Sequence, residues 1–375
     1  MALSCVKVLM VARIRENCGN NTAADRIRKH LEETPFCCVL KDVNDFHDVT
    51  ELKHFIACHK ITVAIGIHAY HAGKVLHGCG IPYAIIFGGT DLNEYHTDSN
   101  ILPVMSRVVN EAKYLVTFSA ALRKRADSLW RKIKDDEGQV KAVSDDRFIT
   151  IPQAVLTNPS TFCLRNYLRK NGYKITRNPP LLFSLIAGIR PVKDPAFLLQ
   201  AFSNWWQHNQ NVLLLIIGPK LNNEFAEEFE KRVKQASGVV FIPGLSLEDT
   251  HAVMRDSFIV LNSSLSEGMS CAILEAMSLG VPVIARNIPG NYAIIQHRID
   301  GLLYDTPQEF VKLADEILSD DVLYEKIKQT ALEKIKLKHN CDAEKRSYQM
   351  LASNLSASYK QSSKTASVLY DDIYS

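Results

Sequence analysis

The sequence predicts an α/β protein made of two doubly wound domains. Short apolar runs bounded by turn residues alternate along the chain with segments of helical periodicity. The clearest case is a strand-like run, Phe258–Leu261, then a loop, a helical pattern over Cys271–Leu279 and a second strand-like run, Val281–Ala285. This order of strand, loop, helix and strand forms half of a doubly wound domain. A chain of 375 residues is also longer than one hydrophobic core usually serves.

Composition is that of a globular protein, with 46% apolar and 23% charged residues. A net charge of +3 is too small to indicate a nucleic-acid partner, and no apolar run approaches the roughly 20 residues of a transmembrane segment. Nine scattered cysteines, with Cys37 and Cys38 adjacent and no C-x2-C pair, favour neither zinc nor a disulfide framework. A reducing, cytoplasmic location is therefore expected, and secretion is the weaker alternative. The sequence indicates no oligomeric state.

The loop before the Cys271–Leu279 pattern has the chemistry of a site for a phosphorylated ligand. Ser270 stands where a helix N-cap is expected, so the amides of Gly268, Met269 and Ser270 can hold a diphosphate. Seven residues separate two carboxylates, Glu267 and Glu275, and a carboxylate can accept two hydrogen bonds from a vicinal diol of a ribose or sugar. The alternative for Glu275 is a solvent-facing residue on an ordinary helix.

This loop, together with Leu274-Glu275-Ala276-Met277, resembles the donor-site signature of the retaining family-4 glycosyltransferases. The resemblance implies the GT-B fold, in which two Rossmann-like domains face a central cleft. It also implies that Glu275 binds the nucleotide ribose and that Glu267 contacts the donor sugar. The family usually has Glu-Gly-Phe-Gly at the turn, where this chain has Glu-Gly-Met-Ser. That change keeps the backbone donors and alters the shape beside the sugar.

A second cationic loop follows the strand-like run Leu182–Ala187 and contains Arg190 and Lys193. An arginine and a lysine in one tight loop can neutralise a diphosphate, although two exposed cations are the alternative. The resemblance implies that both residues bind the donor diphosphate and, with Glu267, make up the catalytic set. It also places Leu245, after another strand-like run, beside the nucleobase.

The first domain has candidate residues after its own strand-like runs, where parallel sheets assemble ligand sites. The candidates for the cleft or acceptor side are Gly19, His68, His71 and Asp91. Gly88 stands where the family often has a histidine, and His68 and His71 are candidates to fill part of that space or to be structural. Two histidines three apart without a third ligand predict no metal site.

Domain boundaries follow from breakers and periodicity. We expect a first domain at 1–172 on the acceptor side and a donor domain at 178–330, with a linker over 158–180 that is rich in Asn-Pro and Asn-Gly pairs. Helical periodicity runs over 323–355, and by resemblance the helix at 331–355 returns to the first domain. The Ser-rich residues 356–375 are expected to form a mobile tail.

The predicted function is transfer of a sugar from a UDP- or GDP-sugar to an acceptor, with retention at the anomeric carbon. The nucleoside-diphosphate sugar is a co-substrate, and neither a cofactor nor a metal is expected. The alternative is a catalytically inactive nucleotide-sugar sensor on the same scaffold, favoured by Gly88 in place of the histidine. A nicotinamide enzyme is a more distant alternative, because the chain has no G-x-G-x-x-G fingerprint after its first strand.

Overall fold

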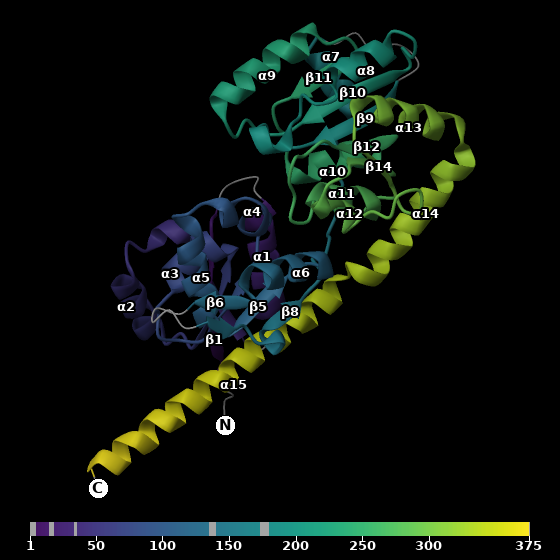
Figure 1. The fold of residues 1–375 in the computed structure, drawn as a ribbon. Coiled ribbons are helices and arrows are strands. Elements are labelled where there is room, and N and C mark those ends of the chain that lie inside the picture. The colour runs from purple at the N-terminus through teal and green to yellow at the C-terminus, as the bar shows by residue number, and fades with distance from the viewer. Residues whose placement is uncertain (1–4, 15–18, 34–35, 135–139, 173–179, 375) are drawn as a thin grey trace. The chain divides into compact units, whose positions relative to one another are not determined.

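The computed structural model describes residues 5–374 except 15–18, 34–35, 135–139 and 173–179 (Figure 1). The chain forms two compact units, one made of residues 1–153 with 341–375 and the other of residues 154–340. Each unit has a six-stranded sheet whose strands all pair in parallel. The prediction of two doubly wound α/β units is therefore confirmed.

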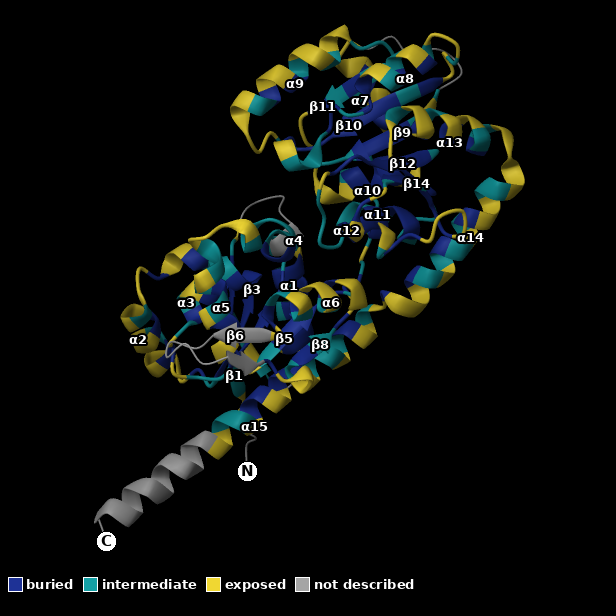
Figure 2. Cartoon of the chain, in the orientation of Figure 1, coloured by how far each residue is buried: buried dark blue, intermediate teal, exposed yellow. Residues whose placement is uncertain are grey.

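The sheet of the first unit changes direction of winding between β1 and β3. The strand order is β2 (Phe36–Asp42), β1 (Val6–Ala12), β3 (Val63–Ile67), β4 (Tyr83–Ile86), β5 (Tyr114–Thr117) and β8 (Phe148–Thr150). Strand β1 lies between the two windings, since Val8 pairs in register with Cys38 on one side and Val63 on the other. Residues 8–12 of β1 are fully buried, and Figure 2 shows dark blue elements in the interior of this unit.

Helices pack around this sheet and complete the first unit. They are α1 (Gly19–Glu32), α2 (Val49–His59), α3 (Gly73–Leu76), α4 (Gly89–Asn93), α5 (Ile101–Glu111), α6 (Ala120–Trp130) and α15 (Cys341–Tyr374). Between α6 and β8, strands β6 (Lys132–Lys134) and β7 (Val140–Ala142) pair antiparallel.

A buried ionic cluster fastens α15 to α1. Glu344 of α15 accepts hydrogen bonds from Arg26 at 2.7 and 3.1 Å, and its Oε2 lies 2.9 Å from His30 Nε2. All three side chains are buried. Because an uncompensated buried charge is costly, this cluster specifies where the terminal helix docks on the first unit.

The sheet of the second unit reverses its strand order between β9 and β12. The order is β11 (Val239–Ile242), β10 (Val212–Ile217), β9 (Leu181–Ile186), β12 (Ile259–Asn262), β13 (Val283–Arg286) and β14 (Leu302–Tyr304). The helices are α7 (Leu164–Lys170), α8 (Leu199–Trp206), α9 (Asn223–Gln235), α10 (Leu247–Arg255), α11 (Cys271–Ser278), α12 (Pro289–Tyr292), α13 (Pro307–Ser319) and α14 (Asp321–Lys338). In a doubly wound sheet the reversal point is where loops open to receive a ligand.

The expected linker at 158–180 is wrong for its first half. The second unit begins at Ala154 rather than at residue 178, and residues 164–170 form helix α7. Leu164 and Leu168, four residues apart, are buried against Leu215 and Ile217 of β10. Burial of these two leucines on one face of α7 thus stabilises a helix, although Asn-Pro and Asn-Gly pairs flank it. Residues 173–179 lie outside the described part of the chain.

The C-terminal prediction also needs correction. The periodic stretch is two helices rather than one. Helix α14 belongs to the second unit, which ends at residue 340, and α15 begins at Cys341 in the first unit. The helix of the first unit therefore starts ten residues later than expected. The backbone of residues 356–374, expected as a mobile tail, is helical. None of the described helices combines the length and apolar character that a membrane span needs.

One disulfide was not anticipated. Strands β1 and β2 pair with Lys7 opposite Cys37, which brings Cys5 and Cys37 to a Cα–Cα distance of 6.2 Å, and the two cysteines are bonded. That distance is within the ordinary range for a disulfide. A separation of 32 residues leaves no local signal in the sequence, so only the strand register reveals the pair.

The cluster on α15 predicts a large stability loss in Glu344→Ala. Removing the carboxylate that Arg26 and His30 share should lower the free energy of unfolding by about 3–5 kcal/mol, as for other broken buried ion pairs. Urea unfolding measures the loss. The control is Glu33→Ala, which removes the surface pair with Lys345 and should leave the unfolding midpoint nearly unchanged. Similar losses in both variants would contradict the role of the buried cluster.

Candidate functional site

Two loops meet at the strand-order reversal of the second unit. Residues 187–195 follow β9 and residues 263–270 follow β12, its neighbour in the sheet. The backbone N–H of Leu265 donates to Val192 O at 2.9 Å, and Ser263 Oγ donates to Lys193 O at 3.0 Å. These bonds hold the two loops against each other at the carboxyl edge of the sheet.

A charged pair lies between the loops. Lys193 Nζ is 2.6 Å from Glu267 Oε1. The same oxygen accepts hydrogen bonds from Ser264 Oγ at 2.7 Å and Asn262 Nδ2 at 3.2 Å. The Glu267 side chain is 9% exposed and that of Lys193 is 20% exposed, so the cation is more accessible to solvent than the carboxylate.

Burial alone would raise the pKa of the Glu267 carboxyl, because desolvation disfavours the charged form. The positive charge of Lys193 and the hydrogen bonds from Lys193, Ser264 and Asn262 oppose this effect and leave the pKa below its usual value. Glu267 is therefore a carboxylate at neutral pH and holds Lys193 in place.

Asn262, at the end of β12, connects this pair to the loop after β13. Its carbonyl accepts from Tyr304 OH at 2.9 Å, and its Oδ1 accepts from Asn291 Nδ2 at 2.8 Å. Gly290 lies so close to the backbone of Glu267 that a Cβ there would be 2.2 Å from Glu267 O. Only glycine allows this approach, so the Pro289-Gly290 turn at the start of α12 is part of the site.

A second ion pair, missed by the sequence analysis, fixes the end of the cationic loop. Arg286 Nη1 donates to Asp194 Oδ2 at 3.0 Å and to Ser263 O at 3.3 Å, and its guanidinium lies 3.9 Å from the ring centroid of Phe197. Asp194 has a left-handed backbone with φ 41°. A strained residue held by specific contacts is common beside functional loops.

Helix α11 begins at the site, with Ser270 at the N-cap as predicted. Its hydroxyl makes no capping bond and instead accepts from Asn262 Nδ2 at 3.4 Å. Gly268 and Met269 lie in the turn just before it, and Met269 packs against the core under α11. Glu275 lies within α11 with 13% of its side chain exposed, which excludes the solvent-facing alternative.

The side chains of the remaining donor-side candidates, Arg190 and Leu245, do not join the Lys193–Glu267 ion pair. Arg190 is exposed, and among the described residues none forms an ion pair or hydrogen bond with its guanidinium. Leu245 follows the edge strand β11 and packs against the core formed by α7, β10 and β11. The structure thus brings the side chains of Glu267 and Lys193 together, while Arg190 contacts Lys193 only through its backbone, where its carbonyl oxygen accepts from Lys193 N–H at 3.1 Å.

The first unit has a histidine–carboxylate cluster after β3 and β4. His68 Nδ1 lies 2.6 Å from Asp91 Oδ1, and His68 Nε2 lies 2.6 Å from Thr90 Oγ1. Asp91 is fully buried and also accepts from the backbone N–H groups of Ala69 at 2.8 Å and Gly88 at 2.9 Å. Asp91 therefore holds the two loops together and cannot itself touch a ligand.

His71 lies in the same π-helical turn, His68–Ala72, and is half-buried. Burial, with the nearby charges of His68 and Arg13, lowers its pKa to about 4, so the ring is neutral at pH 7. Its Nε2 is 3.4 Å from Tyr95 OH. Gly19 begins α1, and the preceding loop residues 15–18 are outside the described part of the chain.

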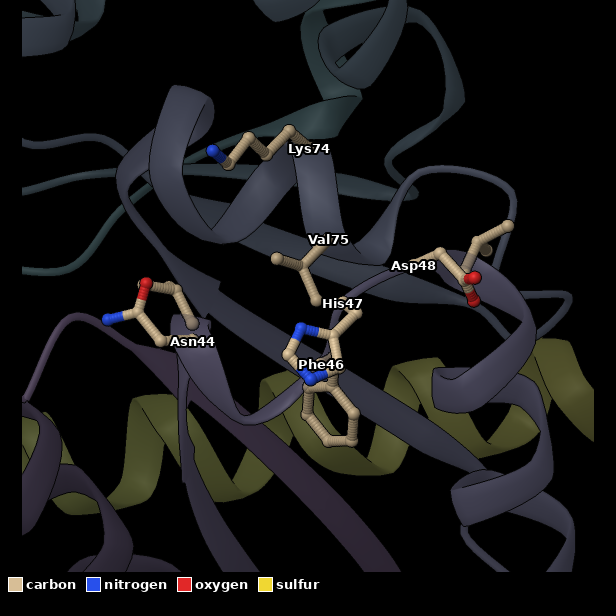
Figure 3. A pocket seen from close by; sticks show the side chains of 8 residues that line it. Asn44, Phe46, His47, Asp48, Lys74 and Val75 are labelled. Carbon is tan, nitrogen blue, oxygen red and sulfur yellow. The ribbon is translucent and has the colours of Figure 1, made fainter.

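A pocket of about 500 Å³ lies next to this turn in the first unit, between the segment after β2 and the start of α3 (Figure 3). The sequence analysis did not predict it. Its lining is Val43, Asn44, Phe46, His47, Asp48, Val49, Lys74 and Val75. Across the described residues, no three His, Cys, Asp or Glu side chains are arranged to hold a metal ion.

The Lys193–Glu267 pair predicts a pH-dependent stability difference. Lys193→Ala should lower the free energy of unfolding by about 2 kcal/mol at pH 7, because a buried carboxylate loses its countercharge. Since the pKa of Glu267 in the folded protein lies below its ordinary value of 4.5, this contribution to stability is fully present above pH 4.5. It is lost as the pH falls through the folded pKa. Denaturant unfolding at pH 7 and at pH 3–4 measures the difference.

The matched control is Lys220→Ala, because Lys220 forms a more exposed pair with Glu230 in the same unit. It should change stability by no more than about 0.5 kcal/mol at either pH. A Lys193→Ala loss that stays constant with pH would contradict the paired state of Glu267.

Known proteins resemble this chain in sequence. The family model described as glycosyl transferases group 1 matches residues 170–334. Glycosyltransferase 1 domain-containing protein 1 of Xenopus tropicalis is 38% identical over 351 residues, which cover 93% of this chain and 98% of that protein. The Escherichia coli UDP-Gal:alpha-D-GlcNAc-diphosphoundecaprenol alpha-1,3-galactosyltransferase is 24% identical over 147 residues, 38% of each chain.

Solved structures with similar folds include Anabaena HepE in complex with UDP and glucose, with a TM-score of 0.72 and 15% identity over 94% of this chain and all of that one. Sucrose-phosphate synthase from Thermosynechococcus elongatus has a TM-score of 0.74 and 14% identity, with the same coverage of 94% and 100%. These likenesses show the GT-B fold. With the full-length relative, they establish that the chain belongs to the group 1 glycosyltransferase family.

Proposed function

We propose that the chain transfers a glycosyl unit from a UDP- or GDP-sugar to an acceptor, with retention of anomeric configuration and without a divalent metal. The observation that carries the proposal is the Lys193–Glu267 pair at the strand-order reversal of the second unit. Ligands of doubly wound sheets bind at this point. HepE, which shares the fold, binds UDP and glucose, and this supports a nucleoside diphosphate as the ligand class.

The donor diphosphate would lie against the cationic loop. Lys193 offers a charge that is already positioned by Glu267, and the exposed guanidinium of Arg190 can make a two-pronged contact with phosphate. As the glycosidic bond breaks, negative charge grows on the leaving diphosphate. A well-placed hydrogen-bond donor aimed at such charge lowers the activation barrier by about 3 kcal/mol. These two cations would therefore stabilise the leaving diphosphate as a metal ion does in other enzymes.

The two glutamates would bind the two parts of the donor on either side of the diphosphate, the ribose and the sugar. Glu275, partly exposed on α11, would accept from the ribose hydroxyls. Glu267 would contact the sugar while it holds Lys193 at the diphosphate. In this arrangement the role of Glu267 is coupled to that of Lys193.

We assign the acceptor side to the first unit, around His68 and His71. Asp91 orients His68, and the neutral ring of His71 can donate or accept a hydrogen bond to an acceptor hydroxyl. The pocket bordered by Lys74 adjoins this turn and gives an acceptor room to enter.

A nucleotide-sugar sensor without turnover is the second candidate, because Gly88 lacks the family's histidine. The position is nevertheless next to an imidazole, since a Cβ at residue 88 would lie 3.2 Å from Cδ2 of His68. His68, at the end of the adjacent strand β3, therefore places an imidazole near the position where the family has its histidine. This favours an active enzyme over a sensor.

A donor panel tests the proposal. The protein is mixed with UDP- and GDP-sugars, and release of the nucleoside diphosphate is followed with and without EDTA. We expect release from one donor class, unchanged by EDTA, and a loss of at least tenfold in kcat/KM for Arg190→Ala that Arg190→Lys does not fully restore. Tight donor binding without release would support the sensor, and restoration by magnesium after EDTA would contradict the metal-independent mechanism.

The ion pair predicts that Glu267 and Lys193 act together on donor binding. In a double-mutant cycle, the loss for Glu267→Ala combined with Lys193→Ala should be smaller than the sum of the single losses by about 1 kcal/mol or more. The reason is that either change already removes the positioned cation. Isothermal titration with the donor found by the panel measures the cycle, and additive losses would show that the two residues bind it independently.

A further inference from the structure

A buried histidine lies behind the proposed ribose carboxylate. His251 is on α10, which packs against α11, and is 1% exposed. Its Nδ1 accepts a hydrogen bond from the backbone N–H of Asn158 at 3.2 Å. A ring nitrogen that accepts carries no proton, so the neutral imidazole has its proton on Nε2.

That Nε2 is aimed at Glu275. It lies 3.9 Å from Glu275 Oε1, beyond hydrogen-bond distance, and no other group among the described residues forms a hydrogen bond with it. A buried donor without a partner is costly, and buried polar groups in folded proteins nearly always have one. The structure thus shows a buried ring nitrogen without a hydrogen-bond partner among the described residues, 3.9 Å from a carboxylate oxygen.

The frame around His251 is well fixed. The segment before α7 crosses α10, where Ser160 N donates to Glu248 O at 3.0 Å and Ser160 Oγ donates to Asp249 Oδ1 at 2.6 Å. The hydroxyls of Thr157 and Ser278 lie 3.4 Å apart and connect this segment to the end of α11. The backbone of Asn158 is therefore held where it sets the tautomer of His251.

We propose that His251 is a positioning residue for Glu275, whose carboxylate receives its Nε2–H when a nucleotide is bound. The proposal rests on the proposed function, in which Glu275 binds the ribose. One oxygen of the carboxylate accepts from His251, and the remaining lone pairs face the two ribose hydroxyls. Because the imidazole is fixed by Asn158, it restricts the rotation of Glu275 to the orientation that accepts from both hydroxyls.

Two substitutions separate this role from simple packing. His251→Asn places an acceptor near the position of Nδ1, so it keeps the bond to Asn158, but its side chain is too short to reach Glu275. His251→Gln places an amide N–H near the position of Nε2, so it keeps a donor for Glu275 and loses the fixed acceptor. Glu275→Gln is the reference variant, since it removes the carboxylate itself.

The readout is the ratio of affinities for uridine diphosphate and its 2′,3′-dideoxy analogue, with the guanosine pair used in its place if the donor panel selects GDP. We expect His251→Asn to unfold near the wild-type midpoint and to lose about tenfold in affinity for the ribonucleotide, with little change for the dideoxy analogue. His251→Gln should keep a ratio closer to that of wild type. A wild-type ratio in His251→Asn, or equal losses for both nucleotides, would overturn the proposal.

A measurement on the unsubstituted protein covers the case in which His251→Asn does not fold. In NMR spectra of protein with ¹⁵N-labelled histidine, the Nε2–H proton of His251 should move downfield with uridine diphosphate and not with the dideoxy analogue. No movement with either nucleotide would overturn the proposal.

Failure of the proposed function has a different signature. If Glu275→Gln leaves the hydroxyl-dependent ratio unchanged, Glu275 does not bind the ribose, and both proposals fall. If Glu275→Gln abolishes the ratio while His251→Asn preserves it, the ribose assignment stands and only the role of His251 is wrong.

Discussion

The ion pair between Lys193 and Glu267 is the constraint on which the second unit's site depends. A carboxylate that is 9% exposed would cost several kcal/mol without a countercharge. Its cation comes from the loop after β9, so the loops after β9 and β12 have to pack together for the charge to be compensated. Asn262 and Ser264 add hydrogen bonds to the same oxygen, and Gly290 lets a third loop pack on its backbone. The loops of the proposed diphosphate site are thus held together by the protein's own contacts.

The sequence predicted the strands well, because apolar runs with turn residues at both ends are local signals. The expected runs Leu182–Ala187, Phe258–Leu261 and Val281–Ala285 agree with β9, β12 and β13 to within one or two residues. It also placed Glu267 and Lys193 at strand ends. It could not reveal Arg286 with Asp194, or Asn262 with Glu267, because those bonds depend on how loops pack, and one of them joins residues 92 apart. The sequence did not reveal the disulfide between Cys5 and Cys37 either, because it depends on the pairing of strands that are distant in sequence.

Errors arose where local polarity competed with packing. Breakers around residues 158–180 suggested a linker, yet two leucines of α7 cover β10 and tie this stretch to the second unit. The Ser-rich C-terminal stretch suggested a tail, yet the backbone of α15 continues through it. Serine lowers helix propensity only modestly, and α15 is anchored upstream by the buried Glu344 cluster. For both segments, the local composition was therefore a poorer guide to structure than the positions of the few residues that are buried.

Both units bury a carboxylate among loops at the carboxyl edge of the sheet, but with different consequences for charge. In the second unit Glu267 is paired with Lys193, and the exposed Arg190 of the same loop adds a positive charge that no carboxylate among the described residues pairs with. In the first unit Asp91 is fully buried and interacts with His68, next to His71, which is neutral at pH 7 because of its low pKa. Positive charge suits a diphosphate, whereas a neutral imidazole suits a hydroxyl that must give up a proton. This difference is the physical basis for assigning the donor to the second unit and the acceptor to the first.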